Sequence, residues 1–131
     1  MMKIIIVDDS ATARMIVRRC LEIAGCSDAE FIEAGNGKEA LSLLKEHKVD
    51  FVISDLNMPV MDGEMLLKWM KASPKLNEIP LVVLSSAVNA AKDRVLLDMG
   101  AFAVMSKPIS PAKINESMSA LIPNKESGYG Y

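Results

Sequence analysis

Short apolar segments alternate along this chain with longer segments whose apolar residues recur at helical spacing. Residues 3–7 and 51–55 are rich in aliphatic, largely β-branched side chains, which is typical of strands buried on both faces. Residues 11–24 instead have apolar side chains every three or four positions, and Gly25 supplies a stop. Strands are expected at residues 3–7, 31–33, 51–55, 81–84 and 102–105. Helices are expected at residues 11–24, from 37 to about 46, around 66–70, in a segment that reaches 99, and from 111 to before 123.

Five strands that alternate with five helices predict a parallel sheet with helices on both faces, because each parallel connection must cross back over the sheet. The expected fold class is therefore α/β, with a single doubly wound (βα)5 domain. The length of 131 residues suits one domain with one adequate core. We assign residues 1–122 to this domain and expect the polar, glycine-containing residues 123–131 to form a disordered C-terminal tail.

The charge and hydropathy of the chain exclude several classes of function. The formal net charge of −2 gives no general attraction to nucleic acid or to anionic lipid. No apolar run approaches the roughly 20 residues that a membrane-spanning helix needs, and the N-terminus lacks a signal-peptide pattern. We therefore expect a cytoplasmic protein that binds neither nucleic acid directly nor a membrane.

The cysteines and the single histidine do not form a recognisable metal site. Cys20 and Cys26 lack metal-ligand spacing and are expected to be reduced, small hydrophobic residues. His47 lies in a charged stretch that is typical of a solvated helix end. A zinc site is not expected from these residues.

Polar side chains stand at the ends of four of the five expected strands. They are Asp8 and Asp9 after the first strand, Asp55 at the end of the third, Ser85 after the fourth and Lys107 after the fifth. In open parallel sheets, reactive groups gather beyond the carboxyl ends of the strands. We therefore expect these five side chains to meet at one edge of the sheet.

Three converging carboxylates repel one another, and a divalent metal ion relieves that repulsion. An acidic, all-oxygen, open site suits Mg²⁺, or Mn²⁺, much better than Zn²⁺. In this interpretation Asp8 and Asp9 hold the metal, and an oxygen of Asp55 is left free to attack phosphorus.

Lys107 and Ser85 then acquire roles in the same chemistry. A lysine at the strand end can pair first with the carboxylate of Asp55 and then with a phosphoryl oxygen. The hydroxyl of Ser85 can hydrogen-bond the phosphoryl group once that group is present, which biases a two-state loop. The prediction is a phosphate-operated switch centred on Asp55.

Each of these residues alone has an ordinary explanation. An aspartate after a strand commonly caps a helix, a serine such as Ser85 does the same, and Lys107 can be a plain loop lysine. Only the placement of all five residues at strand ends favours the functional interpretation.

Four segments carry a resemblance to a known family. They are residues 5–10 (IIVDDS), 33–41 (EAGNGKEAL), 55–63 (DLNMPVMDG) and 107–108 (KP). From about residue 3 to residue 121, the chain resembles the receiver domain of bacterial response regulators, which takes phosphate from a histidine kinase onto an aspartate. Residues 9–14 (DSATAR) resemble in particular the stand-alone, chemotaxis-type receivers.

The resemblance implies a flavodoxin-like five-stranded sheet in the order 2-1-3-4-5 and a specific set of site residues. That set comprises Asp55 as phosphoacceptor and metal-site residue, Asp8 and Asp9 as acidic metal-site residues, the backbone carbonyl of Asn57 as a further Mg²⁺ ligand, Ser85 as the switch hydroxyl and Lys107 as the phosphate-pairing lysine.

The resemblance also implies a function and its partners. Phosphoryl transfer from a kinase phosphohistidine to Asp55 would require Mg²⁺, would switch partner binding and would be reversed by self-dephosphorylation. The chain would be a phosphoacceptor switch rather than an enzyme. Expected partners are a sensor histidine kinase or phosphotransfer protein, and an output protein that docks on the face of the fourth helix, fifth strand and fifth helix. The chain is expected to be a monomer or a weak, phosphorylation-dependent dimer.

One position departs from the family pattern. Receivers often have Tyr or Phe three residues before the strand-five lysine, and this chain has Val104 there. Phe102 does not replace that ring, since period-two alternation places it on the same side as Val104. The aromatic relay of the family is therefore not expected in this chain.

Two other functions fit parts of the pattern. A phosphatase with an aspartyl-phosphate intermediate, of the haloacid-dehalogenase type, typically has an acid/base Asp two residues after its nucleophile. Asn57 occupies that position here and cannot carry protons in this way. A phosphate-independent interaction module of the same fold would not need the repulsive trio of Asp8, Asp9 and Asp55.

Overall fold

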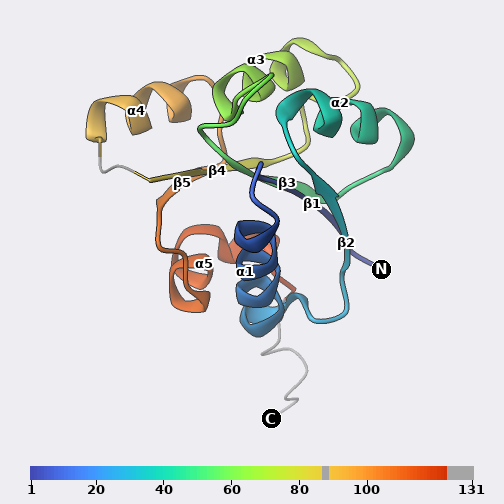
Figure 1. The fold of residues 1–131 in the computed structure, drawn as a ribbon, viewed down its shortest axis with the longest axis vertical. Coiled ribbons are helices and arrows are strands. Elements are labelled where there is room, and N and C mark those ends of the chain that lie inside the picture. The colour runs from blue at the N-terminus through green and yellow to red at the C-terminus, as the bar shows by residue number, and fades with distance from the viewer. Residues whose placement is uncertain (87–88, 124–131) are drawn as a thin grey trace.

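The computed structural model describes residues 1–86 and 89–123, and within them five parallel strands form one sheet in the order β2-β1-β3-β4-β5 (Figure 1). The strands are β1 (Lys3–Val7), β2 (Glu30–Ala34), β3 (Phe51–Asp55), β4 (Leu81–Ser85) and β5 (Ala103–Ser106). This topology confirms the predicted doubly wound α/β fold with the flavodoxin-like order 2-1-3-4-5.

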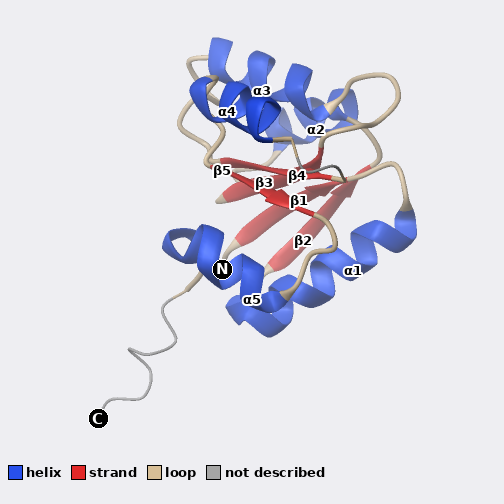
Figure 2. Ribbon diagram, turned by 90° about the vertical axis from the view of Figure 1, so that its left-hand side faces the viewer, coloured by secondary structure: helices blue, strands red, loops and turns tan. Residues whose placement is uncertain are grey.

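In the described part of the chain, five α-helices cover the two faces of the sheet. They are α1 (Ala11–Leu21), α2 (Gly37–Glu46), α3 (Gly63–Ala72), α4 (Ala90–Asp98) and α5 (Pro111–Met118). Helices α2, α3 and α4 lie on one face, and α1 and α5 lie on the other (Figure 2). None of the helices within the described residues is both long enough and apolar enough to cross a membrane.

The four aliphatic residues of strand β1 are divided between two cores. Ile5 and Val7 belong to the core beneath α2, α3 and α4, whereas Ile4 and Ile6 belong to the core that α1 and α5 cover. All four side chains are no more than 1% exposed. Because successive side chains of a strand point to opposite faces, a strand buried on both sides favours apolar residues at consecutive positions, as at residues 4–7. Each such side chain contributes about 1.5–3 kcal/mol by leaving water.

Several element boundaries differ from the sequence-based expectation; β2 and β4, for example, extend beyond the predicted residues 31–33 and 81–84. Helix α1 ends at Leu21 and continues as a π-helical turn (Glu22–Cys26), in which Gly25 has a φ of 136°. That positive φ is readily adopted only by glycine and ends the regular helix. Strand β5 begins at Ala103, one residue later than predicted, so Phe102 lies before the strand and is 40% exposed. Helix α5 ends at Met118 and is followed by a 3-10 turn.

Other expectations concern the cysteines and the tail. Cys20 and Cys26 form no disulfide bond within the described residues, and Cys26 is buried, as expected for a small hydrophobic residue. Residues 124–131, which make up nearly all of the expected tail, lie outside the described residues.

The strand register brings the ends of β1, β3, β4 and β5 together. Val7 of β1 pairs with Ser54 of β3, so that Asp8 and Asp55 are both one position further along their strands. Asp55 in turn pairs with Leu84, next to Ser85 of β4. The sheet order therefore creates one polar edge from residues that are distant in sequence.

Candidate functional site

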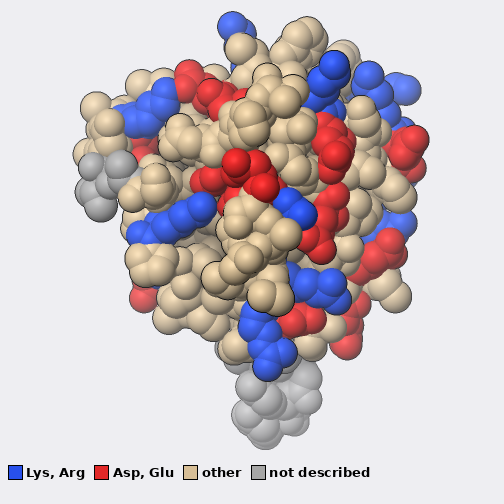
Figure 3. Space-filling model, viewed as in Figure 1, with Lys and Arg blue, Asp and Glu red and all other residues tan. Residues whose placement is uncertain are grey.

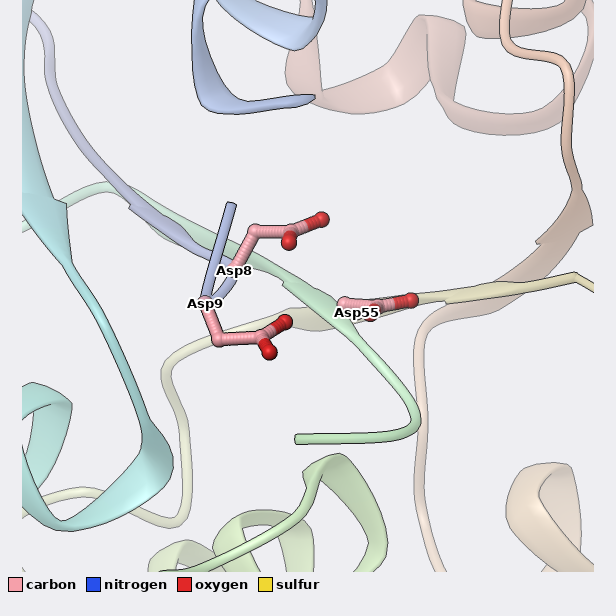
Figure 4. Close-up of side chains that lie close together, drawn as sticks. All are labelled: Asp8, Asp9 and Asp55. Atoms are coloured by element: carbon pink, nitrogen blue, oxygen red, sulfur yellow. The ribbon is translucent and has the colours of Figure 1, made fainter. Parts of the chain in front are cut away.

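The acidic part of the site is formed by the ends of β1 and β3. One carboxylate oxygen from each of Asp8, Asp9 and Asp55 lies within 4.8 Å of the others. Figure 4 shows the three side chains projecting from neighbouring strand ends toward a common space. Asp8 and Asp55 are 3% and 8% exposed, whereas Asp9 is exposed to solvent. The cluster is therefore buried on one side and open on the other.

The donor set of this cluster fits Mg²⁺. It consists of carboxylate oxygens, and its open side leaves room for the waters and phosphate oxygens that Mg²⁺ keeps as ligands. Within the described residues, no histidine or cysteine joins this group, so the soft donors that favour Zn²⁺ are missing from it. Asp8, Asp9 and Asp55 are thus the side chains that could hold the ion.

Lys107 reaches the cluster from the segment after β5. Its Nζ atom lies 3.1 Å from Oδ1 of Asp55 and 3.4 Å from Oδ2 of Asp8. The backbone N–H of Lys107 donates to the carbonyl of Ser85 at 2.8 Å, which anchors this segment to the end of β4. The lysine therefore bridges the two buried carboxylates from the side of β5.

Burial and charge act in opposite directions on the pKa values of this pair. Burial raises the pKa of Asp55, and the nearby Asp8 carboxylate adds to that rise, while the hydrogen bond and charge of Lys107 offset only part of it. Burial alone would lower the pKa of Lys107, but its contacts with Asp55 and Asp8 outweigh burial and raise that pKa. At neutral pH the lysine is firmly cationic beside a carboxylate whose ionised form is disfavoured.

The remaining predicted site residues lie at the same edge. Ser85 is the last residue of β4, is 6% exposed and pairs with Ser106 of β5. Asn57 is exposed in the loop between β3 and α3, two positions after Asp55. The sheet thus brings Ser85, Lys107 and the acidic trio to one end, as predicted, with Asn57 in the adjoining loop.

Gly63 allows α3 to begin directly against the end of β3. A Cβ atom at this position would lie 2.5 Å from the carbonyl oxygen of Asp55 and 3.0 Å from the Cα of Leu56. The backbone N–H of Gly63 donates to the carbonyl of Leu56 at 2.8 Å, and Asp62 caps the helix by accepting from the N–H of Met65. Asp62 therefore caps the start of α3, and Gly63 lets that helix approach the end of β3 closely.

Comparison with known proteins identifies the family. The profile described as "Response regulator receiver domain" matches residues 4–119. The chain belongs to this receiver family.

Two curated relatives of this receiver are chemotaxis proteins. Chemotaxis protein CheY-3 of Vibrio cholerae is 33% identical over 120 residues, which cover 92% of this chain and 91% of the relative. The chemotaxis protein CheY homolog of Campylobacter jejuni is 33% identical over 122 residues, covering 92% of both chains.

Solved structures agree with this assignment. Chemotaxis response regulator CheY4 of Vibrio cholerae superposes with a TM-score of 0.80 at 30% identity, covering 93% of this chain and 99% of that chain. The signal receiver domain of a signal transduction histidine kinase from Syntrophus aciditrophicus gives a TM-score of 0.79 at 30% identity, covering 93% of this chain and 90% of that one. The receiver fold is therefore matched across nearly the whole chain.

Two further residues of this receiver contact the site, and sequence reasoning did not assign them to it. Arg14 lies in α1, and its Nη1 donates to the backbone carbonyl of Asp8 at 2.5 Å. Lys113 of α5 donates to the carbonyls of Ser106 at 3.1 Å and Pro108 at 2.8 Å, on either side of Lys107. Arg14 falls in the segment 9–14 that resembles chemotaxis-type receivers, but neither that resemblance nor helical spacing shows that Arg14 and Lys113 bind backbone carbonyls five to seven residues earlier in the chain.

Val104 occupies the position where many receivers have an aromatic ring. It is partly buried and packs against the core beneath α2, α3 and α4. Phe102, two residues earlier, is 40% exposed and precedes β5. Neither residue offers this receiver a buried aromatic ring next to Ser85.

Proposed function

We propose that this chain is a two-component response regulator that accepts a phosphoryl group on Asp55 from the phosphohistidine of a sensor kinase or phosphotransfer protein. The observation that carries this proposal is the convergence of three carboxylates and one lysine at the end of the sheet. Asp55 lies within 4.8 Å of the other two carboxylates and 3.1 Å from the Nζ atom of Lys107. This arrangement supplies a nucleophile, a metal-binding group and a cation at one point.

In the proposed transfer, a carboxylate oxygen of Asp55 attacks phosphorus, and the P–N bond of the phosphohistidine breaks. The bonding electrons of that bond leave with the imidazole, and a mixed anhydride forms on Asp55. Mg²⁺ held by Asp8, Asp9, Asp55 and the backbone carbonyl of Asn57 would neutralise the charge on the phosphoryl oxygens. Lys107 would move from the carboxylate to a phosphoryl oxygen, so its positive charge would stay at the reacting centre throughout.

The hydroxyl of Ser85 would then bind the new phosphoryl group. Ser85 ends β4, whose following segment leads into α4, so a shift of its side chain would act on the α4–β5–α5 face. We place the output partner on this face and the kinase or phosphotransfer protein at the open side of the acidic cluster. The relay would use aliphatic packing around Val104 rather than a rotating ring. The regulator would act in the cytoplasm as a monomer or a weak, phosphorylation-dependent dimer.

The chemistry is tested by incubating the protein with acetyl phosphate and Mg²⁺ and measuring its intact mass. The wild type should gain one phosphoryl group, and the gain should be lost when Mg²⁺ is chelated. Asp55→Asn should abolish the gain. Asp62→Asn is a matched control, because it makes the same change in the same loop and asparagine can still cap α3.

Undiminished labelling of Asp55→Asn would overturn the assignment of the phosphoacceptor. Absence of labelling in the wild type, together with unchanged amide resonances on adding acetyl phosphate and Mg²⁺, would favour a phosphate-independent module instead. Repeated turnover of a generic phosphomonoester would favour the hydrolase.

A further inference from the structure

We propose that Arg14 is a positioning residue that fixes the peptide between Asp8 and Asp9, and thereby directs the Asp9 carboxylate toward Asp8 and Asp55. The inference rests on the proposed function to the extent that this acidic cluster is the metal site of the regulator. It concerns a residue of α1 that does not itself offer a ligand to the cluster.

Two hydrogen bonds hold the guanidinium of Arg14 in place. Nη1 donates to the backbone carbonyl of Asp8 at 2.5 Å, and Nε donates to Oε1 of Glu33 at 2.6 Å. The Arg14 side chain is 19% exposed and that of Glu33 is 45% exposed. Arg14 therefore joins α1 to the ends of both β1 and β2, with its planar group fixed by two partners in a way that a single ammonium could not match.

The backbone of Asp8 is consequently held on both sides. Its N–H donates to the carbonyl of Ala34 in β2 at 3.0 Å, and its C=O accepts from Arg14. The Asp8 side chain has its own supports, since Oδ1 accepts from the N–H of Ser10 at 2.9 Å and Oδ2 lies 3.4 Å from Nζ of Lys107. Asp8 is thus fixed independently of any metal ion.

Asp9 lacks such supports. Within residues 1–86 and 89–123, its carboxylate makes no hydrogen bond and no ion pair, and it is exposed. The direction of this side chain is therefore set by the backbone from which it projects. The peptide whose carbonyl Arg14 holds is the one that leads into Asp9, so Arg14 controls the orientation of the least supported member of the trio.

If Arg14 acted only through its charge, its removal would change Mg²⁺ affinity in the opposite direction from the change expected of a positioning residue. As a cation near the site, Arg14 repels Mg²⁺, so its loss would tighten Mg²⁺ binding if charge were its only influence. As a positioning residue, it organises the ligands beforehand, so its loss weakens binding. The sign of the change in affinity distinguishes the two.

The experiment measures Mg²⁺ affinity of the unphosphorylated protein from a titration of amide NMR resonances. Arg14→Met and Arg14→Lys should each weaken Mg²⁺ binding roughly tenfold, as is found when a group that orients a metal ligand is removed. Arg14→Lys should not restore Mg²⁺ affinity, because lysine keeps the positive charge but cannot hold both the Asp8 carbonyl and the Glu33 carboxylate in the same geometry. Arg19→Met is the matched control: Arg19 is exposed on the same helix, makes no hydrogen bond or ion pair within the described residues, and its loss should leave the affinity unchanged.

A second variant tests the anchor of Arg14. Glu33→Met removes the partner that orients the guanidinium and should weaken Mg²⁺ binding by a smaller factor. The double variant Arg14→Met/Glu33→Met should bind no more weakly than Arg14→Met alone, because both changes interrupt one chain of contacts. If Arg14→Met does not fold, Arg14→Lys and Glu33→Met decide the question.

Unchanged or tighter binding in the variants at position 14 would overturn the inference. Acetyl phosphate labelling of the wild type reports on the proposed function separately. A wild type that is labelled on Asp55 while the variants bind Mg²⁺ normally refutes the role of Arg14 alone. A wild type that binds Mg²⁺ but is not labelled refutes the proposed function alone, and a wild type without Mg²⁺ binding refutes both.

Discussion

Lys107 and Asp55 form an ion pair across the end of the sheet, with Nζ 3.1 Å from Oδ1. The pair joins the segment after β5 to the end of β3, with β4 between them in the sheet. A second oxygen, Oδ2 of Asp8, lies 3.4 Å from the same ammonium. In the unphosphorylated protein the lysine thus relieves part of the repulsion between two buried carboxylates.

Replacing Lys107 should therefore reduce stability as well as labelling. Lys107→Met leaves Asp8 and Asp55 facing each other without a cation and should lower the free energy of unfolding by about 1 kcal/mol, a figure kept small because the lysine side chain is 30% exposed. Urea denaturation without Mg²⁺ measures this change, and acetyl phosphate labelling should slow in parallel. Lys68→Met, at an exposed position of α3, is the control. Equal stability of the wild type and Lys107→Met would show that the ion pair has no net effect.

Replacing Asp55 should have the opposite effect on stability at neutral pH. Burial raises the pKa of this carboxyl above its ordinary value, so the folded protein holds the proton more tightly than the unfolded chain. Stability is therefore lost as pH rises through the window that begins at the ordinary aspartate pKa and ends at the raised folded value. Asp55→Asn abolishes this loss and should be more stable than the wild type at pH 7 by about 0.5–2 kcal/mol when Mg²⁺ is absent.

The advantage of Asp55→Asn should shrink as pH is lowered, and it should vanish below the ordinary aspartate pKa, where the wild-type carboxyl is protonated in both the folded and the unfolded state. Denaturation curves at several pH values measure the trend. Added Mg²⁺ should stabilise the wild type more than the variant, because the ion binds the folded cluster. A variant less stable than the wild type at pH 7 without Mg²⁺ would contradict the assigned direction of the pKa shift.

Gly63 and Gly35 provide a matched pair for testing close packing against the end of β3. An added Cβ at Gly63 would lie 2.5 Å from the Asp55 carbonyl oxygen, whereas nothing lies within 4 Å of one at Gly35. Gly63→Ala should therefore destabilise the protein by at least about 2 kcal/mol, since backbone would have to move. Gly35→Ala should change stability by less than about 0.5 kcal/mol. Thermal denaturation of the two variants gives the comparison, and equal midpoints would refute it.

Val60 has a φ of 69° in the loop between β3 and α3 and is 76% exposed. This left-handed conformation costs a residue with a Cβ roughly 1–2 kcal/mol, and most for a β-branched one. Val60→Gly should therefore be more stable than Val60→Ala by about 1 kcal/mol, since alanine keeps the Cβ and glycine does not. Denaturant unfolding of both variants tests this, and a less stable glycine variant would show that the strain is absent.

Much of the site was visible in the sequence because its residues occupy strand ends, and strand ends are local features. Asp55 ends one apolar segment, and Asp8 and Asp9 follow another. The spacing of apolar residues and the parallel topology were therefore enough to predict that these three residues lie at one edge of the sheet. The exact ends of the helices and strands could not be predicted from the sequence in the same way. The π-helical turn after Leu21 and the late start of β5 at Ala103 depend on how those segments pack, not on propensity alone.

The sequence by itself determined the alternation of elements, the two-sided burial of the first strand and the set of polar residues at the strand ends. The spacing of apolar residues and the residues that follow an apolar segment are properties of contiguous sequence, so they can be recognised before the fold is known. Only the tertiary structure decided that Arg14 holds the Asp8 carbonyl, that Gly63 lies against Asp55 and that Val60 adopts a positive φ. These relationships depend on how closely the loop and the helix that follow a strand pack against the end of that strand, and such contacts leave no periodic signal in the sequence.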